Sequence, residues 1–318
     1  MFLVWLEWPE KCFRIDAGAL HALRRFVKEK DPAGRVVRVR SETAFLKALP
    51  QATQVLTWNF RREWYARAKN LRLVATPAAG REFVEPPPEV CRQGPASPVL
   101  HFGHFHGAYI AEAVAGFMLG WAKGFFAVRN APAECRDWPR TWLSDKCFDV
   151  SGTRAVIVGY GHVGRAIGRK LRALGVSVAG ITRHGVYEGL SKASRVSPDS
   201  LLRGADWLIL ALPSTTGTDD YLDQALIRKL PRRCIVINVG RGNSIDERAL
   251  YTALKTKRLA GAYLDVRKHE SSATVLESPG YVPELAELPN CIIMPHASAF
   301  SRNYLLACLE ELKDDGVI

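Results

Sequence analysis

The sequence lacks paired cysteines, long apolar runs and a leader-like start. Its seven cysteines never form a Cys-x-x-Cys pair; they stand at positions 12, 91, 135, 147, 234, 291 and 308. Such a scattered, odd-numbered set argues against a zinc ribbon or a disulfide framework and indicates reduced thiols, so we expect a cytoplasmic protein. The central apolar stretch, 113–122, lies between Glu112 and Lys123 and falls well short of the roughly 20 residues that a membrane span requires. Residues 1–7 carry neither a basic region nor a cleavage site, so we expect no secretory signal and no membrane partner.

The composition is that of a globular protein with sizeable cores. The chain has 318 residues, of which 47% are hydrophobic and 24% charged, and this indicates two domains of ordinary size. The net charge is +12, yet the Lys and Arg residues are spread along the chain, often on expected helix faces. We therefore expect solvated positive faces that attract anionic substrates and phosphorylated cofactors, and no nucleic-acid partner.

Short apolar runs alternate with amphipathic stretches, which is typical of a parallel α/β fold. Strands are predicted at 2–6, 35–39, 54–58, 71–75, 99–102, 154–158, 176–181, 206–211, 234–239, 260–264 and 291–294. Helices are predicted at 17–30, 42–49, 61–69, 109–127, 163–174, 220–229, 246–256 and 303–313. The proline-rich stretch 86–98 predicts a loop, and Asp246 is predicted to cap the helix that follows it. The expected fold class is α/β, with two parallel-sheet domains.

A glycine-rich turn follows the strand predicted at 154–158. The pattern G-x-G-x-x-G is formed by Gly159, Gly161, His162, Val163 and Gly164, with Tyr160 after the first glycine. In a dinucleotide site the first glycine permits the tight turn, the second lets the backbone approach a pyrophosphate and the third allows close helix–strand packing. The N-terminus of the following helix then faces the anion. This order predicts a dinucleotide site; the alternative is a glycine turn without a ligand.

The end of the next strand, 176–181, bears on which dinucleotide binds. An acidic residue usually stands there and accepts a hydrogen bond from the ribose 2′-hydroxyl of NAD. This chain has Thr182 and Arg183 instead, so no carboxylate repels a 2′-phosphate and a guanidinium is placed to pair with one. We therefore expect NADP to be preferred over NAD. The alternative is that Arg183 is a solvated loop residue and that both cofactors are used.

An arginine, a glutamate and a histidine each follow a predicted strand. These are Arg241, Glu270 and His296, and strand ends of this kind line the ligand crevice of a parallel sheet. The planar fork of Arg241 suits a carboxylate and a keto oxygen, while the imidazole of His296 suits proton transfer near neutral pH. Glu270 is expected to hydrogen-bond the imidazole and raise its pKa, which keeps a proton available. Taken singly, each residue has a structural alternative. Arg241 could form a surface ion pair, Glu270 could be a solvated charge in a loop, and His296 could cap or pack.

Several segments in a fixed order carry a family resemblance. They are VGYGHVG at 158–164, LALPSTTGT at 210–218, INVGRG at 237–242, AL at 249–250 and 253–254, LAGAYLDV at 259–266, LPN at 288–290 and MPH at 294–296. From about Ala111 to His296 the chain therefore resembles the D-isomer-specific 2-hydroxyacid dehydrogenase family, which includes glyoxylate and hydroxypyruvate reductases. The first hundred residues match loosely, with 73–80 resembling the substrate loop. Arg267 stands where the family has an aromatic residue, and Ser271 where it has proline.

The resemblance implies a Rossmann-type nucleotide domain, residues 108–296, inserted in a flavodoxin-like substrate domain, residues 1–107 and 297–318. It implies hydride transfer between a nicotinamide cofactor and C2 of a small 2-oxo or 2-hydroxy acid, with D specificity and usually in a homodimer. His296 would be the acid–base and Arg241 the substrate ligand.

The same resemblance implies a set of cofactor and substrate contacts. The cofactor positions are Gly159, Gly161, His162, Val163, Gly164, Thr182, Arg183, Leu212, Pro213, Thr218, Val239 and Asp265. Backbone N–H groups of Ala79 and Gly80 would meet the substrate carboxylate alongside Arg241.

Alternative functions and site residues are also compatible with the sequence. A dinucleotide-sensing binding protein could use the same scaffold, because fold does not determine function; the complete Arg, Glu and His set favours an enzyme. Glu277 is the nearest alternative to Glu270. The imidazoles of His101, His104 and His106 resemble a metal cluster, but no carboxylate or cysteine stands near them in the sequence. A hinge or cleft lining is therefore favoured there, and no metal is expected.

Overall fold

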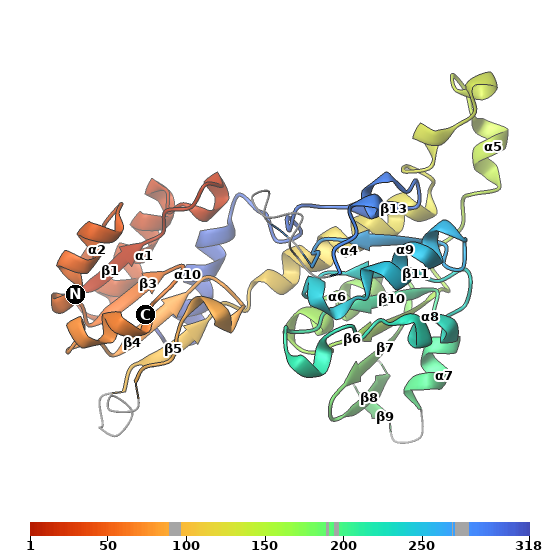
Figure 1. The fold of residues 1–318 in the computed structure, drawn as a ribbon. Coiled ribbons are helices and arrows are strands. Elements are labelled where there is room, and N and C mark those ends of the chain that lie inside the picture. The colour runs from red at the N-terminus through yellow and green to blue at the C-terminus, as the bar shows by residue number, and fades with distance from the viewer. Residues whose placement is uncertain (89–96, 189–190, 194–196, 269, 271–279) are drawn as a thin grey trace. The chain divides into compact units, whose positions relative to one another are not determined.

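The computed structural model describes most of the chain (Figure 1); residues 89–96, 189–190, 194–196, 269 and 271–279 lie outside the description. Cys91, Glu277 and part of the expected 86–98 loop are among those. Contacts divide the chain into unit 1, Met1–His106 with Phe300–Ile318, and unit 2, Gly107–Ala299. The divisions fall after residues 106 and 299, where the sequence led us to expect them after 107 and 296.

Unit 1 is built on a five-stranded sheet in the order β2-β1-β3-β4-β5, with every pair parallel. This is the flavodoxin-like order 2-1-3-4-5, so the expected fold class is confirmed for this unit. The strands are β1 (Phe2–Trp5), β2 (Val36–Arg38), β3 (Gln54–Thr57), β4 (Leu73–Thr76) and β5 (Val99–Phe102). The helices are α1 (Ala17–Lys30), α2 (Glu42–Ala48) and α10 (Tyr304–Asp314), and α10 packs beside α1.

The helix predicted at 61–69 is a shorter 3-10 segment, Arg62–Arg67. It buries Trp64 and Tyr65 in one cluster with Phe45 of α2. The two aromatic residues are adjacent in the sequence rather than three or four apart, so a regular helix would not direct both to one face. The tighter segment keeps both rings in the core.

Unit 2 is built on an eight-stranded sheet in the order β13-β12-β11-β10-β6-β7-β8-β9. The strands are β6 (Arg154–Val158), β7 (Ser177–Thr182), β8 (Gly185–Glu188), β9 (Ser191–Ala193), β10 (Trp207–Leu210), β11 (Ile235–Asn238), β12 (Gly261–Leu264) and β13 (Cys291–Ile293). All pairs from β13 to β7 are parallel, and β8 and β9 add an antiparallel hairpin that the sequence did not predict. The strand order reverses between β6 and β10, which is the point where doubly wound sheets bind ligands.

Both faces of the unit 2 sheet are covered by helices. Alternate strand residues point to opposite faces: Ile157 and Ile209 pack with α4 and α6, whereas Val158 and Leu210 pack with α7, α8 and α9. The sequences of strands that are buried on both faces are nearly continuous apolar runs, and the central strands of unit 2 have such sequences. The covering helices are α4 (His106–Ala122), α6 (His162–Ala173), α7 (Pro198–Arg203), α8 (Gln224–Lys229) and α9 (Glu247–Lys255); a further short helix, α5 (Arg140–Ser144), buries no residue and lies away from the sheet (Figure 1).

The two largest differences from the predicted helix boundaries in unit 2 are the end of α4 and the start of α8. The helix expected at 109–127 ends at Ala122, because Gly124 has φ 72° and the Phe125 N–H bonds back to Gly120 O at 2.8 Å, a closure that glycine favours. The helix expected at 220–229 begins only after Asp223, whose side chain accepts from the Leu226 N–H.

Helices α5 and α7 were not predicted from the sequence. For α7 a signal was present: Ser197 caps the helix and Pro198 occupies its first turn, a combination typical of helix starts.

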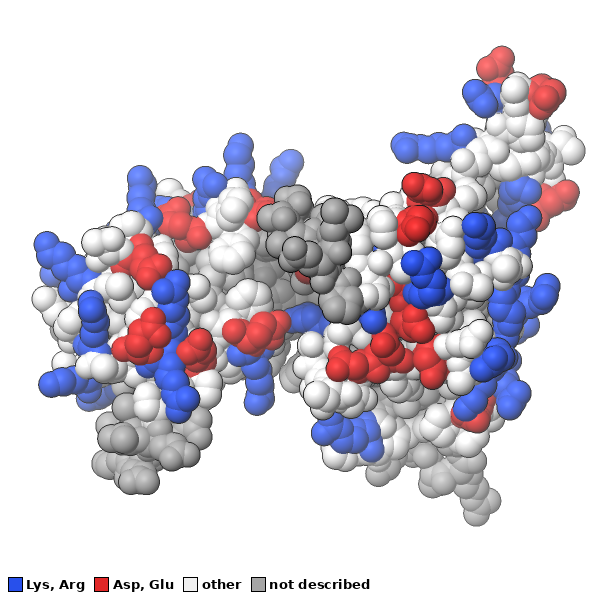
Figure 2. All heavy atoms as spheres, in the orientation of Figure 1, with Lys and Arg blue, Asp and Glu red and all other residues white. Residues whose placement is uncertain are grey.

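Lys and Arg side chains are mixed with Asp and Glu on the face drawn in Figure 2. Lys229, for example, lies 2.9 Å from Asp199. On that face the Lys and Arg side chains lie on both units rather than in one basic area. None of the helices that the structure describes has the length and apolar character needed to cross a membrane.

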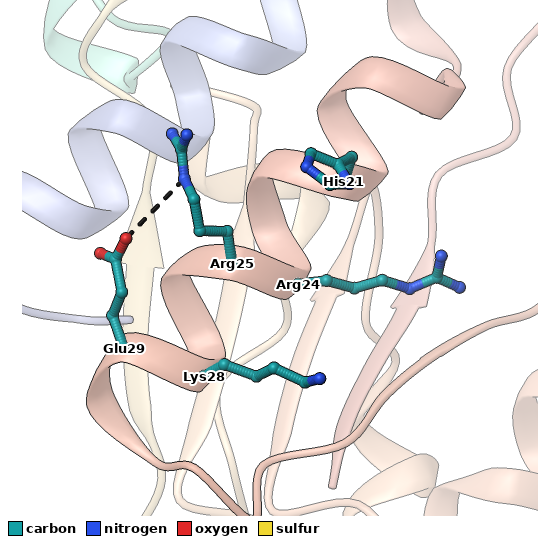
Figure 3. A pocket seen from close by; sticks show the side chains of 5 residues that line it. All are labelled: His21, Arg24, Arg25, Lys28 and Glu29. Carbon is teal, nitrogen blue, oxygen red and sulfur yellow. Dashed lines mark ion pairs between the residues drawn. The ribbon is translucent and has the colours of Figure 1, made fainter.

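A shallow hollow on unit 1 is lined by side chains of one helix, α1 (Figure 3); they are His21, Arg24, Arg25, Lys28 and Glu29. Arg25 and Glu29 are one turn apart and pair at 3.7 Å. Long exposed side chains on a single helix face account for this hollow, and it contains no residue that the sequence singled out.

The cap of α9 is testable. As predicted, the Asp246 carboxylate accepts hydrogen bonds from the N–H groups of Arg248 at 3.0 Å and Ala249 at 3.1 Å. Asp246→Ala should lower the free energy of unfolding by about 1 kcal/mol, and Asp246→Asn should cost little because asparagine caps equally well. Urea unfolding followed by circular dichroism measures both. Equal losses in the two variants would show that the cap bond is not the cause.

Candidate active site

The candidate catalytic residues follow three neighbouring strands that end at one level. In the parallel register Asn238 of β11 pairs with Leu264 of β12, and Leu264 pairs with Ile293 of β13. Arg241 lies three residues after the end of β11, Glu270 six residues after the end of β12 and His296 three residues after the end of β13. The sheet therefore delivers all three segments to its carboxyl edge within unit 2.

His296 and Glu270 are hydrogen-bonded, with Nδ1 and Oε2 2.8 Å apart. Both side chains are partly open to solvent, at 49% and 41% exposure. The bond to Glu270 raises the pKa of His296, and the charge of Asp265 adds to this, whereas burial and Arg241 oppose it. Burial is the largest single effect on Glu270 and would raise its pKa. The hydrogen bond and charge of His296, a backbone hydrogen bond from Arg267 and the charge of Arg241 together outweigh burial, so the pKa of Glu270 is lowered. The pair therefore favours an imidazolium beside a carboxylate, as expected from the sequence.

Asp265 holds the backbone of the histidine segment. Its main-chain carbonyl accepts from the His296 N–H at 2.8 Å, and its carboxylate accepts from the N–H groups of Ala297 at 2.9 Å and Ser298 at 3.1 Å. His296 has φ 52°, a left-handed conformation that costs energy for a residue with a Cβ. Asp265 is 3% exposed, and burial raises its pKa. The carboxylate thus stabilises a strained backbone that directs the imidazole.

Arg241 lies in a turn that buried polar groups hold in place. Its carbonyl accepts from Asn238 Nδ2 at 3.1 Å and from Ser244 Oγ at 2.7 Å, and its Nη1 donates to Gly240 O at 3.0 Å. Asn238 and Ser244 are both fully buried. The sequence did not single them out, although a polar residue at the end of the apolar run IVIN was a signal.

The arrangement brings an anion receptor and a proton donor to one edge of the sheet. The positive charge of Arg241 lowers the pKa of both His296 and Glu270, so the guanidinium lies close enough to act on both. Because Glu270 occupies Nδ1 of His296, the other ring nitrogen, Nε2, is left to face a substrate.

The glycine turn has the geometry that a dinucleotide needs. Gly159 has φ 92°, and a Cβ there would stand 2.4 Å from Ala211 O. A Cβ on Gly164 would stand 2.4 Å from Gly159 O, so the helix and turn touch directly. No atom lies within 4 Å of a Cβ built on Gly161, and α6 begins at the next residue, His162. A ligand phosphate can therefore approach the backbone at the helix N-terminus.

The other predicted cofactor positions lie on the same edge, where β10 lies beside β6 and β11 lies beside β10. Leu212 and Val163 are half-buried and Pro213 is exposed. Thr218 is 8% exposed and donates to Pro213 O at 2.7 Å, which closes the loop after β10. Val239 is buried directly after β11.

Thr182 ends β7 and shapes the turn that follows. Its Oγ1 accepts from the His184 N–H at 3.1 Å and donates to Gly185 O at 3.0 Å. Arg183 is exposed, and within the described part of the chain its guanidinium makes no ion pair or hydrogen bond. The side chain is therefore available to an anionic ligand.

Ala79 and Gly80 follow β4 in unit 1. Ala79 is exposed and Gly80 is buried. The carboxylate of Glu82 lies where a Cβ on Gly80 would stand, 2.3 Å from it. A negative group therefore already lies against this turn.

The three histidines at 101–106 connect to α10 within unit 1. His101 Nε2 lies 3.0 Å from Asp315 Oδ2, the His104 backbone N–H donates to Glu311 at 2.8 Å, and His106 Nε2 lies 2.7 Å from the Tyr304 hydroxyl. The carboxylates that the nearby sequence lacked thus come from the C-terminal helix. Carboxylate oxygens of Glu311 and Asp315 lie within 4.8 Å of a ring nitrogen of His101. Their hydrogen bonds to His101 and to the His104 N–H link β5 and the residues after it to the C-terminal helix.

Comparison with known proteins places the chain in a family. Residues 115–298 match the family described as D-isomer specific 2-hydroxyacid dehydrogenase, NAD binding domain. The match covers more than half of the chain, so the protein belongs to the D-isomer specific 2-hydroxyacid dehydrogenase family, as its motifs predicted.

Individual relatives agree with this placement. A glycerate dehydrogenase from Methylorubrum extorquens is 24% identical over 93% of this chain and 88% of its own length. A glyoxylate reductase from Thermococcus kodakarensis is 33% identical over 50% of this chain and 45% of its own length. A D-lactate dehydrogenase structure from Treponema pallidum superposes with a TM-score of 0.75 at 17% identity, covering 98% of this chain and 94% of the other. The family supports nicotinamide-dependent dehydrogenase chemistry on 2-hydroxy acids.

The His296–Glu270 pair gives a pH-dependent prediction. Glu270→Gln should lower the pKa of His296 toward about 6.5, which an NMR titration of the imidazole measures. Because the folded pKa of His296 is raised, its stabilising contribution is complete below about pH 6.5 and is lost as pH rises through the folded value. Because the folded pKa of Glu270 is lowered, the stabilising contribution of its carboxylate is present above about pH 4.3 and is lost as pH falls through the folded pKa.

The stability difference between wild type and Glu270→Gln should therefore be largest between about pH 5 and 6.5 and small at pH 9. Thermal unfolding across this range tests it. A difference that grows toward pH 9 would contradict the assigned ion pair.

Proposed function

We propose that the protein is a D-specific 2-oxo-acid reductase that prefers NADPH. The observation that carries this proposal is the His296–Glu270 hydrogen bond of 2.8 Å, at the same sheet edge as Arg241 and the glycine turn. Unit 2 is the dinucleotide-binding domain and unit 1 the substrate domain in this proposal. The dinucleotide-sensing alternative is not favoured, because binding alone does not require an acid–base pair.

The proposed mechanism assigns one task to each side chain. Arg241 pairs with the substrate carboxylate and polarises the keto oxygen. His296, protonated, donates its Nε2 proton to the keto oxygen as hydride reaches C2. Glu270 stabilises the imidazolium before this step and orients the ring. A bound nicotinamide cofactor supplies the hydride.

The reverse direction uses the same groups. Oxidation of the 2-hydroxy acid requires neutral His296 to accept the hydroxyl proton, so a raised pKa favours reduction near neutral pH. The substrate proposed here is a small 2-oxo acid such as glyoxylate or hydroxypyruvate.

The NADPH preference rests on Thr182 and Arg183. The threonine is neutral, its hydroxyl is used by the turn itself, and the exposed guanidinium follows it directly. No acidic side chain stands at the end of β7 to accept from a 2′-hydroxyl, whereas Arg183 can pair with a 2′-phosphate.

Arg183→Ser should lower kcat/KM for NADPH by about tenfold to hundredfold, the value of one charged hydrogen bond, and leave kcat/KM for NADH nearly unchanged. Steady-state kinetics with both cofactors and a panel of 2-oxo acids measure this. Arg203→Ser, which removes an exposed arginine at the end of α7, is the matched control. A clear preference of the wild-type protein for NADH would contradict the proposed NADPH preference.

The catalytic assignments predict two different kinetic signatures. His296→Ala should lower kcat by about 10²–10⁴-fold, the usual worth of a general acid, with cofactor affinity retained. Arg241→Lys should mainly raise the substrate KM, because a point charge cannot replace the bidentate fork. Binding of NADPH measured by fluorescence, alongside turnover of glyoxylate, separates the two. Retained turnover in His296→Ala would reject the role of the imidazole.

We further propose a homodimer and a cytoplasmic location. Several large apolar side chains of the segment 119–148 are exposed, with Trp138 at 78% and Phe125 at 67%, and a partner subunit could cover them. The six cysteines that the structure describes are all free thiols, which suits a reducing compartment.

A further inference from the structure

A buried ion pair lies directly beneath the segment that carries Glu270. Glu247, the first residue of α9, and Arg267, two residues after Asp265, are 2% and 7% exposed at their side chains. The guanidinium meets the carboxylate at two points: Nε donates to Oε1 at 3.0 Å and Nη2 donates to Oε2 at 2.7 Å. Buried charges of this kind are stable only when paired and fully hydrogen-bonded.

The Glu247 carboxylate also accepts from the backbone on both sides of Glu270. Oε1 accepts from the Lys268 N–H at 3.0 Å, and Oε2 accepts from the Val282 N–H at 2.9 Å. Arg267 adds a bond from Nη2 to Val282 O at 2.6 Å. One buried pair therefore ties Lys268, two residues before Glu270, and Val282, twelve residues after it, to the start of α9.

The same backbone touches the turn of Arg241. A Cβ built on Gly242 would stand 1.9 Å from the carbonyl carbon of Arg267, so only glycine lets the two segments meet. Arg267 also packs its guanidinium over the ring of Tyr281, 4.5 Å from the centroid. Displacement of the Arg267 backbone would therefore move Glu270 relative to both Arg241 and His296.

We infer that Arg267 and Glu247 are positioning residues, which hold the Glu270 carboxylate against His296 by fixing the chain just before it, where the backbone of Arg267 also hydrogen-bonds Glu270. Glu270 itself is partly exposed and makes its side-chain bond to an imidazole that is also exposed. Such a pair is weak unless its backbone is fixed in advance, because ordering exposed side chains opposes it. The buried pair supplies that order. This inference rests on the proposed role of Glu270 but names different residues.

The test is the pKa of His296 in the free, full-length protein, measured by NMR titration of the imidazole. The groups that act on it are Glu270, Asp265 and Arg241, and none of them is altered in Arg267→Met. This variant should lower the pKa of His296 at least half as far as Glu270→Gln does, and should reduce kcat more than it raises the substrate KM. Arg267→Lys should recover part of the shift, since a lysine can still meet the Glu247 carboxylate.

Two further variants separate positioning from stability. Arg258→Met removes an arginine of unit 2 that bonds to Arg228 O and Leu230 O at 2.8 Å, so it should lower the melting temperature without moving the pKa of His296. The double variant Arg267→Met with Glu247→Met leaves no unpaired buried charge and should fold even if the single variant does not; it should still show the lowered pKa.

An unchanged pKa of His296 in folded Arg267→Met, or in the double variant, would overturn the inference. The titration needs no substrate, so a protein that fails to reduce 2-oxo acids but shows the pKa shift would reject the proposed function and keep the positioning role.

Discussion

The parallel register of β11, β12 and β13 is the constraint on which the site depends. Because the strands end level with one another, the segments that follow them leave the sheet at a common edge. Their separation is then short enough for side chains to interact directly. Each segment is fixed by buried polar bonds: Asn238 and Ser244 hold the arginine turn, and Asp265 holds the histidine turn. A core packed on both faces keeps this edge rigid.

Charge placement on that edge explains why the protonated form of the His296 imidazole is favoured. His296 lies between two acidic groups, Glu270 and Asp265, that raise its pKa, and one basic group, Arg241, that lowers it. The hydrogen bond to Glu270 is the largest effect and decides the direction. The Arg241 charge that opposes the imidazolium is also the one proposed to bind the substrate carboxylate, so binding of that anion would offset part of the effect of Arg241 on the pKa of His296.

Much of this site was predictable because its parts are local in sequence. A strand followed by G-x-G-x-x-G and a helix defines its own geometry, and polar residues after apolar runs locate a strand end. The hairpin β8–β9, the 3-10 form of Arg62–Arg67 and the histidine links to α10 were not predictable in this way. The 3-10 segment and the histidine links depend on contacts between residues distant in sequence, as does the Glu247–Arg267 pair. The hairpin is local, with Glu188 opposite Ser191, but its strands are only three and four residues long. The unusual Arg267 was visible in the sequence, but its partner was not.

The central claim is that His296 donates the proton in reduction. The most direct measurement compares two pKa values: that of His296 from NMR titration of the protein saturated with NADPH, and that from the pH dependence of kcat/KM for glyoxylate at saturating NADPH, which reports the enzyme–NADPH complex that glyoxylate binds. We expect one shared value, above about 6.5, with activity falling as pH rises through it. A profile that is flat across that value, or that falls at a different pH, would contradict the account.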